Sequence, residues 1–361
     1  MSDIIVIGGG IAGLSAAARL SADAQVTVLE MERATGYHAS GRSAALIEEN
    51  YGAPSVQALN RGSMAYFREG GYLSPRGLLI VARADEEEAF RADLAHMGVG
   101  QISPREAVEM VPVLDPATLG FAGYHAEAFD IDTDRLMQDF IRVIRSNGGQ
   151  IVTDATVTQI RRDAHGWHVN AGGEFSARTL VNAAGAWADL VAGLAGVAPL
   201  GIVPHRRSMA RIAAPGGHDT RTWPMFFGTG ESWYAKPDAG ALLVSPAEEV
   251  ASYPHDAYPD DMTLAEGLDR YAQMVTTEVT RPIATWAGLR SFAPDRTLVL
   301  GRDPDVPEFV WCAGQGGYGF QTSPAASVLL ADLVNARAPA LDPASVAALR
   351  PDRLRQNRLR A

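Results

Sequence analysis

The sequence predicts mixed α/β and α+β structure: a Rossmann-like domain assembled from discontinuous segments, with a second domain, built on an antiparallel sheet, inserted into it. Residues 3–30 read as a strand, a glycine turn, a helix and a second strand, which is the βαβ pattern of a parallel sheet. Residues 200–250 alternate in polarity and carry aromatic residues and prolines, as antiparallel strands do. The chain has 361 residues, more than the ~250–300 that one core usually supports.

The remaining elements follow in chain order. The stretch IAGLSAAARLSA is rich in alanine and leucine and predicts the first helix, and AQVTVLE predicts the strand after it. We expect further helices at 84–97, 134–147, 187–194, 262–278 and 323–336. We expect further strands at 150–158, 167–169, 178–182, 297–300 and 308–313. The nucleotide-binding domain then takes residues 1–75, 136–200 and 285–361, and a substrate-binding domain takes residues 76–135 and 201–284.

Composition excludes several classes of function. The net charge of −11 argues against nucleic acid as a partner, and we read the basic tail, residues 350–361, as solvated. Cys312 is the single cysteine, so no intrachain disulfide can form, which fits a reducing compartment. No signal peptide and no apolar stretch of ~20 residues is visible. We therefore expect a soluble cytoplasmic protein without an integral membrane segment.

The glycine turn matches a dinucleotide-binding motif. GGGIAG supplies Gly8, Gly10 and Gly13, which permit a tight turn, close approach of a pyrophosphate, and helix–strand packing. The helix N-terminus, at Ile11 and Ala12, adds free N–H donors and a partial positive charge. Glu30 ends the second strand, where a carboxylate can accept both hydroxyls of an adenosine ribose.

Three later segments favour FAD over NAD. GYHASGRSAA (36–45) is rich in glycine and serine, LVNAAGAWA (180–188) runs from a strand into a turn of small residues, and WCAGQGGYGFQTSP (311–324) runs from a strand through glycines into a helix. The N-terminus of that last helix could face the edge of the flavin where negative charge develops on reduction.

These segments resemble the family of D-amino-acid oxidases and dehydrogenases, which includes glycine and sarcosine oxidases. The similarity runs the length of the chain, through DIDTD (130–134), RRS (206–208), WPM (223–225), YAKPDAG (234–240) and TWAGLRSF (285–292). Within the family, the sequence is most similar to bacterial FAD-dependent D-arginine dehydrogenase.

The resemblance implies a non-covalently bound, extended FAD. It implies contacts to the cofactor, besides the glycine turn and Glu30, from Ser40, Gly41, Arg42, Ser43, Val157, Ala184, Gly185, Trp187, Gly288, Arg290, Gly314, Gly316, Gly317, Tyr318, Gly319, Gln321 and Thr322. It also implies that Arg290 and Arg207 hold a substrate carboxylate, that Tyr51 and Tyr234 close over the substrate, and that Gln315 and Gly317 line the substrate pocket.

The expected reaction is oxidative deamination of a D-amino acid. A hydride passes from Cα to flavin N5, and the resulting imine hydrolyses to a 2-oxo acid and ammonia. The protein must orient Cα, and arginine suits that task because its planar fork binds both oxygens of a carboxylate. No general base is nominated. Electron acceptors to consider are a quinone, a carrier protein or oxygen, and the sequence does not choose among them.

Several residues have other interpretations. Arg290 could pair with Asp295 or Asp303, only one of Arg206 and Arg207 is expected to point inward, and both tyrosines could be core aromatics. Cys312 is read as a small core residue rather than a flavin tether, and His38 as structural or adjacent to the cofactor.

The side-chain pocket departs from the D-arginine pattern. Leu78 aligns with the acid, and Leu46 with the histidine, of arginine-active relatives. A buried guanidinium facing two leucines would lose its pairing, so we expect neutral or apolar substrates, although the nearby Glu48 or Glu49 could restore an acid. Alternatives are a glycine or sarcosine-type secondary-amine oxidase, an FAD-dependent 2-hydroxy-acid dehydrogenase, and a flavin-binding subunit without turnover.

Overall fold

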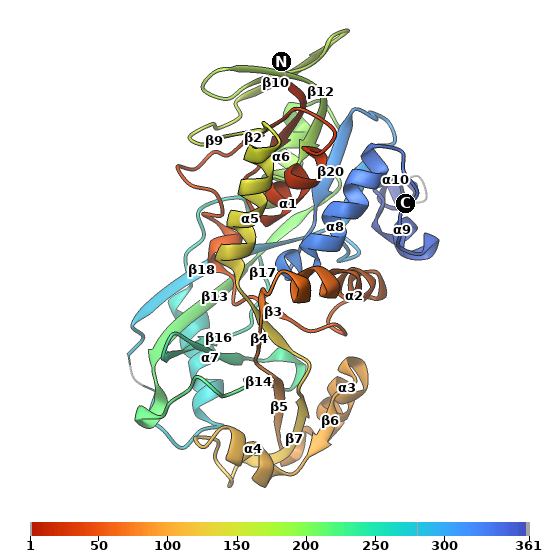
Figure 1. Cartoon of the computed structure of the whole chain (residues 1–361). Coiled ribbons are helices and arrows are strands. Elements are labelled where there is room, and N and C mark those ends of the chain that lie inside the picture. Colours follow the sequence, from red (N-terminus) through yellow and green to blue (C-terminus); the bar gives the residue numbers. More distant parts are fainter. Residues whose placement is uncertain (1, 280, 359–361) are drawn as a thin grey trace.

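The computed structural model describes residues 2–279 and 281–358 and consists of an eight-stranded and a nine-stranded sheet with helices on their faces. In Figure 1 the eight-stranded sheet lies at the end that carries the N-terminus, and the nine-stranded sheet lies at the opposite end. A small three-stranded sheet, β3 (Leu46–Ile47), β8 (Phe129–Ile131) and β4 (Leu73–Pro75), completes the strands. The mixed fold class with an antiparallel second sheet is confirmed.

The eight-stranded sheet is built around the predicted βαβ unit. β1 (Ser2–Ile7) leads into α1 (Ile11–Leu20) and β2 (Val26–Leu29), and β1 and β2 pair in parallel. Segments distant in sequence extend the parallel part: β12 (Glu174–Asn182), β20 (Phe309–Ala313) and β9 (Gln150–Val152). Antiparallel strands at the edges are β10 (Gln159–Asp163), β11 (Gly166–Asn170) and β19 (Val299–Arg302).

Helices bury both faces of this sheet. On one face α1 contacts α5 (Thr133–Ser146) and α8 (Gly319–Val334), and α8 also contacts α2 (Pro54–Glu69). Leu14, Phe140 and Leu330 from these helices are almost fully buried in one core. On the other face α6 (Ala188–Leu194) shares a second core with Trp167 and Trp311. The final helices are α9 (Pro343–Leu349) and α10 (Asp352–Arg358).

The nine-stranded sheet is antiparallel apart from one pair. Its order is β17-β13-β16-β15-β14-β5-β7-β6, with β18 beside β13, and only β14 and β5 run in parallel among these pairs. The strands are β5 (Leu78–Arg83), β6 (Gly100–Ile102), β7 (Leu119–His125), β13 (Val203–Ala213), β14 (Met225–Gly228), β15 (Tyr234–Asp238), β16 (Ala241–Ser245), β17 (Val250–Ala251) and β18 (Ala284–Phe292). The helices α3 (Glu87–Met97), α4 (Pro104–Met110) and α7 (Asp261–Ala272) contact this sheet.

Most expected elements form, with shifted ends. The strand expected at 150–158 stops at Val152, and the helix expected at 262–278 stops at Ala272. Helix α2 was not predicted from the sequence. The domain boundaries stay a prediction, but β18 lies along β13 in the nine-stranded sheet. Residues 285–292, which the boundaries assign to the nucleotide-binding domain, are therefore hydrogen-bonded to the other sheet.

The basic tail is not simply solvated. Within α10, Arg353 pairs with Asp295, with Nε 2.6 Å from Oδ2, and Arg355 pairs with Asp303, with Nη2 2.8 Å from Oδ2. Tail residues 359–361 lie outside the described residues. No helix among the described residues is long and apolar enough to cross a membrane.

Candidate active site

One continuous cavity of about 480 Å³ begins at the carboxyl ends of β1 and β2 and extends to the face of the nine-stranded sheet. At one end Gly8, Gly10 and Glu30 line it, and at the other end Arg290 and Tyr234 do. Crevices at the carboxyl ends of parallel strands are where open α/β sheets bind their ligands. The volume falls within the range of about 300–1,000 Å³ that is common for small-molecule sites.

The glycine turn is shaped by close backbone approaches. Gly8 has φ of +107°, and a Cβ atom there would lie 2.4 Å from the carbonyl oxygen of Ala183. A Cβ atom at Gly13 would lie 1.9 Å from the carbonyl oxygen of Gly8. At Gly10 the nearest atom to a Cβ would be Oγ of Ser40 at 3.2 Å, on the cavity side. The first and third glycines are thus needed for packing, and the second leaves space for a ligand.

The N-terminus of α1 offers donors to an anion. Its N-cap residue, Gly10, provides no side-chain acceptor, and the first turn holds no acid. Ile11 N donates to Oγ of Ser40 at 3.0 Å. Within the described part of the chain, the backbone N–H groups of Ala12 and Gly13 have no hydrogen-bond acceptor. Free N–H groups and the helix dipole together suit a pyrophosphate.

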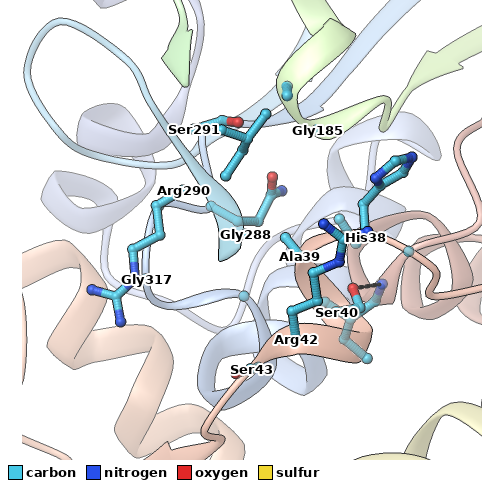
Figure 2. Close-up of a pocket in the computed structure, with 18 of the residues that line it drawn as sticks. His38, Ala39, Ser40, Arg42, Ser43, Gly185, Gly288, Arg290, Ser291 and Gly317 are labelled. Carbon is cyan, nitrogen blue, oxygen red and sulfur yellow. Dashed lines mark hydrogen bonds between the residues drawn. The ribbon is translucent and has the colours of Figure 1, made fainter. Parts of the chain in front are cut away.

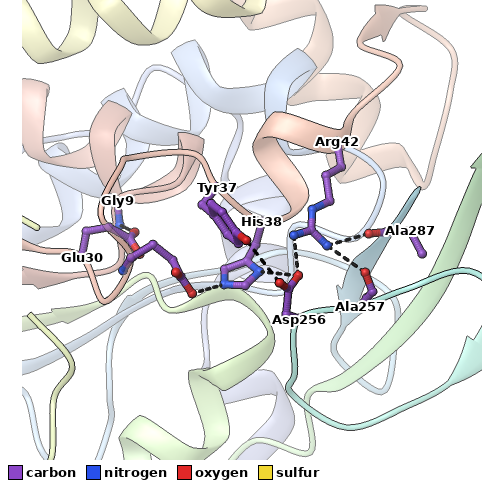
Figure 3. Close-up of polar contacts among 9 residues, drawn as sticks. Gly9, Glu30, Tyr37, His38, Arg42, Asp256, Ala257 and Ala287 are labelled. Carbon is purple, nitrogen blue, oxygen red and sulfur yellow. Dashed lines mark hydrogen bonds and ion pairs between the residues drawn. The ribbon is translucent and has the colours of Figure 1, made fainter. Parts of the chain in front are cut away.

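Glu30 is positioned as the motif requires. Its Oε2 accepts a hydrogen bond from Gly9 N at 2.6 Å and its Oε1 accepts one from Glu32 N at 2.9 Å, and the residue is buried (Figure 3). Each carboxylate oxygen has a second lone pair. The carboxylate can therefore accept a ribose diol, and this donor and acceptor set fits the adenosine diphosphate part of FAD.

The middle of the cavity lies between segments from both sheets. Figure 2 shows Ser40, Arg42 and Ser43 on one side, with Gly185 and Gly288 among the residues opposite. Gly185 has φ of +53°, and a Cβ there would meet no atom within 4 Å. Cofactor residues predicted from the sequence that line the cavity are Gly8, Gly10, Ile11, Ala12, Glu30, Ser40, Arg42, Ser43, Val157, Ala184, Gly185, Trp187, Gly288, Arg290, Gly316, Gly317, Gly319 and Gln321.

Five predicted cofactor residues lie behind this lining: Gly13, Gly41, Gly314, Tyr318 and Thr322. Gly13 and Gly41 permit close backbone packing, since a Cβ at Gly41 would lie 2.5 Å from the oxygen of Gly36. The ring of Tyr318 packs against that of Tyr51, with centroids 5.4 Å apart. The Thr322 hydroxyl donates to the carbonyl oxygen of Tyr318 at 2.8 Å. A contact from any of them to the cofactor stays a prediction.

Arg290 is a charged side chain without a protein anion. It projects from β18 into the cavity, where its guanidinium lies over Gly317, so a Cβ at Gly317 would be 2.9 Å from Nη1 (Figure 2). Arg353 and Arg355 occupy its alternative partners, Asp295 and Asp303. Across the described residues, the Arg290 guanidinium makes no hydrogen bond or ion pair. A cation without a partner, facing a cavity, is a candidate anion site.

Electrostatics keep Arg290 charged. Burial acts to lower the pKa of its guanidinium, but the nearby Tyr51, Tyr234, Glu231 and Glu249 outweigh burial and raise that pKa. Arg290 therefore remains a cation throughout the range in which proteins are folded.

Arg207 lies beside Arg290. On β13 it pairs with Gly288 of β18, so its side chain shares a sheet face with that of Arg290, two residues further along. Arg207 is buried, its Nη2 lies 3.3 Å from Oε1 of Glu249, and its Nε and Nη1 have no partner. Arg206 does not line the cavity and lies nearest to Glu248. Of the two neighbouring arginines, Arg207 is the one that points inward.

The two predicted tyrosines line the same end. The Tyr51 hydroxyl donates to Oε2 of Glu231 at 3.2 Å. Burial raises the pKa of Tyr51 strongly, and the Glu231 charge adds to the effect, so this phenol stays protonated. Tyr234, on β15, is 5% exposed. Glu231 was not predicted from the sequence. It is a non-glycine residue with a φ of +51°, and no sequence motif indicates that conformation.

Apolar side chains form the remaining wall. Leu46 and Leu78 line the cavity as predicted, and they belong to one hydrophobic cluster with Tyr51 and Tyr234. Sequence reasoning missed further members that line the cavity: Met97, Met209, Met225 and Phe227. The WPM segment contained Met225, but the parallel pairing of Met225 with Leu78 could not be read from the sequence.

Glu48 lines the cavity and Glu49 does not. The Glu48 carboxylate is almost fully buried, and both of its oxygens are engaged. Oε2 lies 2.6 Å from Nδ1 of His125, and Oε1 accepts from Asn50 N at 3.0 Å. An acid is therefore near the apolar wall, as the sequence left open, but it already has a basic partner.

Cys312 and His38 behave as the sequence indicated. Burial raises the pKa of the Cys312 thiol to about 12, and the side chain lies behind the cavity lining. His38 lines the cavity, its Nε2 lies 2.9 Å from Oε1 of Glu32, and its ring packs against Trp187. Among the residues described, no three histidine, cysteine or acidic side chains are grouped to hold a metal ion.

Comparison with known proteins bears on the whole chain. Residues 3–333 match the family model described as FAD dependent oxidoreductase. Hydrogen cyanide synthase subunit HcnC of Pseudomonas aeruginosa is 26% identical over 76% of this chain and 66% of its own length. L-2-hydroxyglutarate dehydrogenase of Escherichia coli is 29% identical over 59% of this chain and 54% of its own length. This chain thus spans less than two thirds of either protein.

Other relatives align over nearly their full length. Glycine oxidase of Geobacillus kaustophilus is 26% identical over 94% of both chains. Among solved structures, L-proline dehydrogenase from P. horikoshii has a TM-score of 0.83 at 22% identity, covering 99% of this chain and 98% of the other. None of these carries the name D-arginine dehydrogenase, so that finer resemblance stays a prediction.

Proposed function

The chain belongs to the FAD dependent oxidoreductase (DAO) family, and from this premise we propose that it oxidises a D-amino acid with a neutral or apolar side chain. Its cofactor is FAD, which supplies the hydride acceptor when bound. The single observation that carries the substrate proposal is the Arg290 guanidinium, which lies in the FAD cavity without a protein anion.

Arg290 and Arg207 supply the carboxylate grip. The free fork of Arg290 can bind both oxygens of a carboxylate, and Nε and Nη1 of Arg207 lack partners on the same face. Glu249 already offsets part of the Arg207 charge, with Oε1 3.3 Å from Nη2. A substrate carboxylate bound here would satisfy donors that the protein leaves open, and this fixes the position of Cα.

Tyr51 and Tyr234 would enclose the substrate and exclude water. Because burial and Glu231 raise its pKa, the Tyr51 phenol is a hydrogen-bond donor rather than a base. We assign no general base, since the substrate amine can release its proton to water as it binds, and a backbone carbonyl can accept a hydrogen bond from the neutral amine. Water then hydrolyses the imine product to a 2-oxo acid and ammonia.

The apolar wall supports the side-chain preference. Leu46, Leu78, Met209, Met225 and Phe227 offer no partner to a guanidinium or ammonium group. Glu48 is paired with His125 at 2.6 Å. Burying a substrate cation against these side chains would cost several kcal/mol unless it reached Glu231, which lines the same end and accepts a hydrogen bond from Tyr51. The D configuration rests on the resemblance of the motifs.

A second candidate is oxidation of glycine or of an amino acid, such as sarcosine, whose nitrogen is a secondary amine. It is favoured by the alignment with glycine oxidase over 94% of both chains. The same two arginines could bind the carboxylate of a 2-hydroxy acid. The match to L-2-hydroxyglutarate dehydrogenase makes such an acid a further candidate substrate. Glycine has no side chain that would contact the large apolar side chains of the wall.

Anaerobic mixing separates these candidates. The oxidised flavin band at roughly 450 nm is followed with D- and L-leucine, D-methionine, D-phenylalanine, D-arginine, glycine, sarcosine and 2-hydroxyglutarate. The proposal expects the neutral D-amino acids to bleach the band fastest. Faster bleaching by D-arginine would refute the apolar pocket, and faster bleaching by glycine, sarcosine or the hydroxy acid would favour the alternative. No bleaching by any compound would support a flavin-binding subunit without turnover.

A further inference from the structure

One segment of the cavity wall has neither helix nor strand. Residues 252–260, here called the strap, connect β17 to α7, and His255 and Ala257 of the strap line the cavity. Apart from the contacts described next, the strap is anchored by Ser252 N, which donates to the oxygen of Pro204 at 2.8 Å, and by the buried Ala257. Segments with few buried contacts open more easily than the rest of a fold.

Three side chains of the 36–43 loop converge on the strap (Figure 3). Arg42 Nη2 donates to Oδ1 of Asp256 at 2.5 Å, and Nη1 donates to the oxygen of Ala257 at 3.0 Å. The Tyr37 hydroxyl donates to Oδ2 of Asp256 at 3.3 Å, and Nδ1 of His38 lies 4.0 Å from Oδ1. Arg42 also donates to the oxygen of Ala287 in β18 at 2.8 Å, which joins the strap to the nine-stranded sheet.

The same loop reaches the adenosine end of the cavity. His38 Nε2 lies 2.9 Å from Oε1 of Glu32, and Glu32 N donates to Oε1 of Glu30 at 2.9 Å. Asp256 is therefore connected through His38 and Glu32 to Glu30, the acid expected to bind the ribose. Arg42 was expected to approach the flavin, but its contacts to the strap and to Ala287 use three of its five N–H groups and leave two. Holding the strap is therefore a large part of its role.

We propose that the strap closes the cavity over bound FAD, and that Asp256 is a positioning residue that keeps the strap closed through Arg42 and Tyr37. Asp256 does not line the cavity itself, so its effect on the cofactor passes through the residues it holds. The inference concerns retention of FAD and is independent of the substrate. Its failure would leave the proposed oxidation untouched, and failure of that oxidation would leave the strap untouched.

The chain offers a matched control for the test. Asp256 has a side chain 56% exposed and pairs with an arginine at 2.5 Å. Asp219 has a side chain 57% exposed and pairs with Arg221 at 2.6 Å, and it does not line the cavity. Asp256→Asn and Asp219→Asn therefore remove similar surface charges, and only the first touches the strap.

The experiment measures how fast the holoenzyme releases FAD after dilution, from the rise in fluorescence of the free cofactor. Loss of one exposed charge-assisted contact predicts roughly threefold to tenfold faster release from Asp256→Asn, a wild-type rate for Asp219→Asn, and an intermediate rate for Asp256→Glu. Unfolding temperatures of the three apoproteins, measured alongside, should agree with that of the wild type. Release from Asp256→Asn at the wild-type rate would overturn the proposal.

A second readout follows the strap directly. Hydrogen exchange in peptides that cover residues 252–260, measured by mass spectrometry, reports opening of the strap. Added FAD should slow exchange in these peptides in the wild type, and should slow it less in Asp256→Asn at the same FAD concentration. Exchange that is insensitive to FAD in the wild type would mean that the strap does not close on the cofactor.

Discussion

The two ends of the cavity are built in different ways. The cofactor end is formed by backbone: Gly8 and Gly13 pack against neighbouring carbonyl groups, and α1 presents free N–H donors. The substrate end is formed by side chains, such as Arg290 of β18 and Tyr234 of β15, that come from distant strands of the nine-stranded sheet.

This difference explains what each end tolerates. A backbone cradle admits few changes, because any added Cβ meets fixed atoms or blocks the ligand. A side-chain wall can be changed one residue at a time, so the same cofactor site can serve different substrates. The variants below test that contrast at both ends.

The largest effect is expected at Gly10. Gly10→Ala is compatible with its φ of −78°, and the added methyl group would enter the space above the α1 donors. We expect the variant to fold but to bind FAD at least about 100-fold more weakly, because several N–H contacts to the pyrophosphate are displaced together. Titration of the apoprotein with FAD measures this.

Gly193→Ala is the control, since a Cβ at this helical glycine meets no atom within 4 Å and the site is outside the cavity. Equal FAD affinity of the two variants would contradict a pyrophosphate at the α1 N-terminus.

A smaller effect is expected at the apolar wall. Leu78→Glu would restore an acid on β5 next to Met225. We expect the ratio of kcat/KM for D-arginine over D-leucine to rise by roughly 10-fold to 100-fold, as a new ion pair replaces an unpaired buried cation. Leu78→Met, which keeps volume and polarity, should leave the ratio unchanged. An unchanged ratio in Leu78→Glu, with FAD still bound, would remove Leu78 from the side-chain pocket.

The smallest effect is expected at Tyr51. Tyr51→Phe removes the donor to Glu231 at 3.2 Å and should lower kcat/KM by about 5-fold to 10-fold, the worth of one hydrogen bond. Because the pKa of Tyr51 is raised, the phenol stays neutral as pH rises, so kcat/KM should increase through the ionisation of the substrate amine in wild type and variant alike. A loss of that pH dependence in Tyr51→Phe would mean that Tyr51 itself titrates.

Most of the cofactor end could be predicted from the sequence, because the residues that form it lie close together in the chain. Gly8, Gly10, Gly13 and Glu30 lie within one βαβ unit, whose spacing sets their geometry. Arg290 could be nominated from a family resemblance, but its freedom from Asp295 and Asp303 depends on where the tail docks.

Other features had no local signal. Phe227 lines the cavity because β14 pairs with β15, and Glu231 lies beside it with an unusual positive φ. Asp256 and Arg42 form their hydrogen bond although they are more than 200 residues apart in the chain. The pairing of β18 with β13 in the nine-stranded sheet had no local signal either, because the choice of a partner strand is a long-range property.

Flavin reduction in Arg290→Met tests whether Arg290 receives the substrate carboxylate. Arg206→Met serves as the control, since Arg206 is on the strand next to β18 but outside the cavity lining. Both proteins are compared at equal FAD content with the best substrate found for the wild type. We expect kred/Kd to fall by at least about 100-fold in Arg290→Met and to stay near the wild-type value in Arg206→Met. Wild-type reduction in Arg290→Met would contradict this role of Arg290.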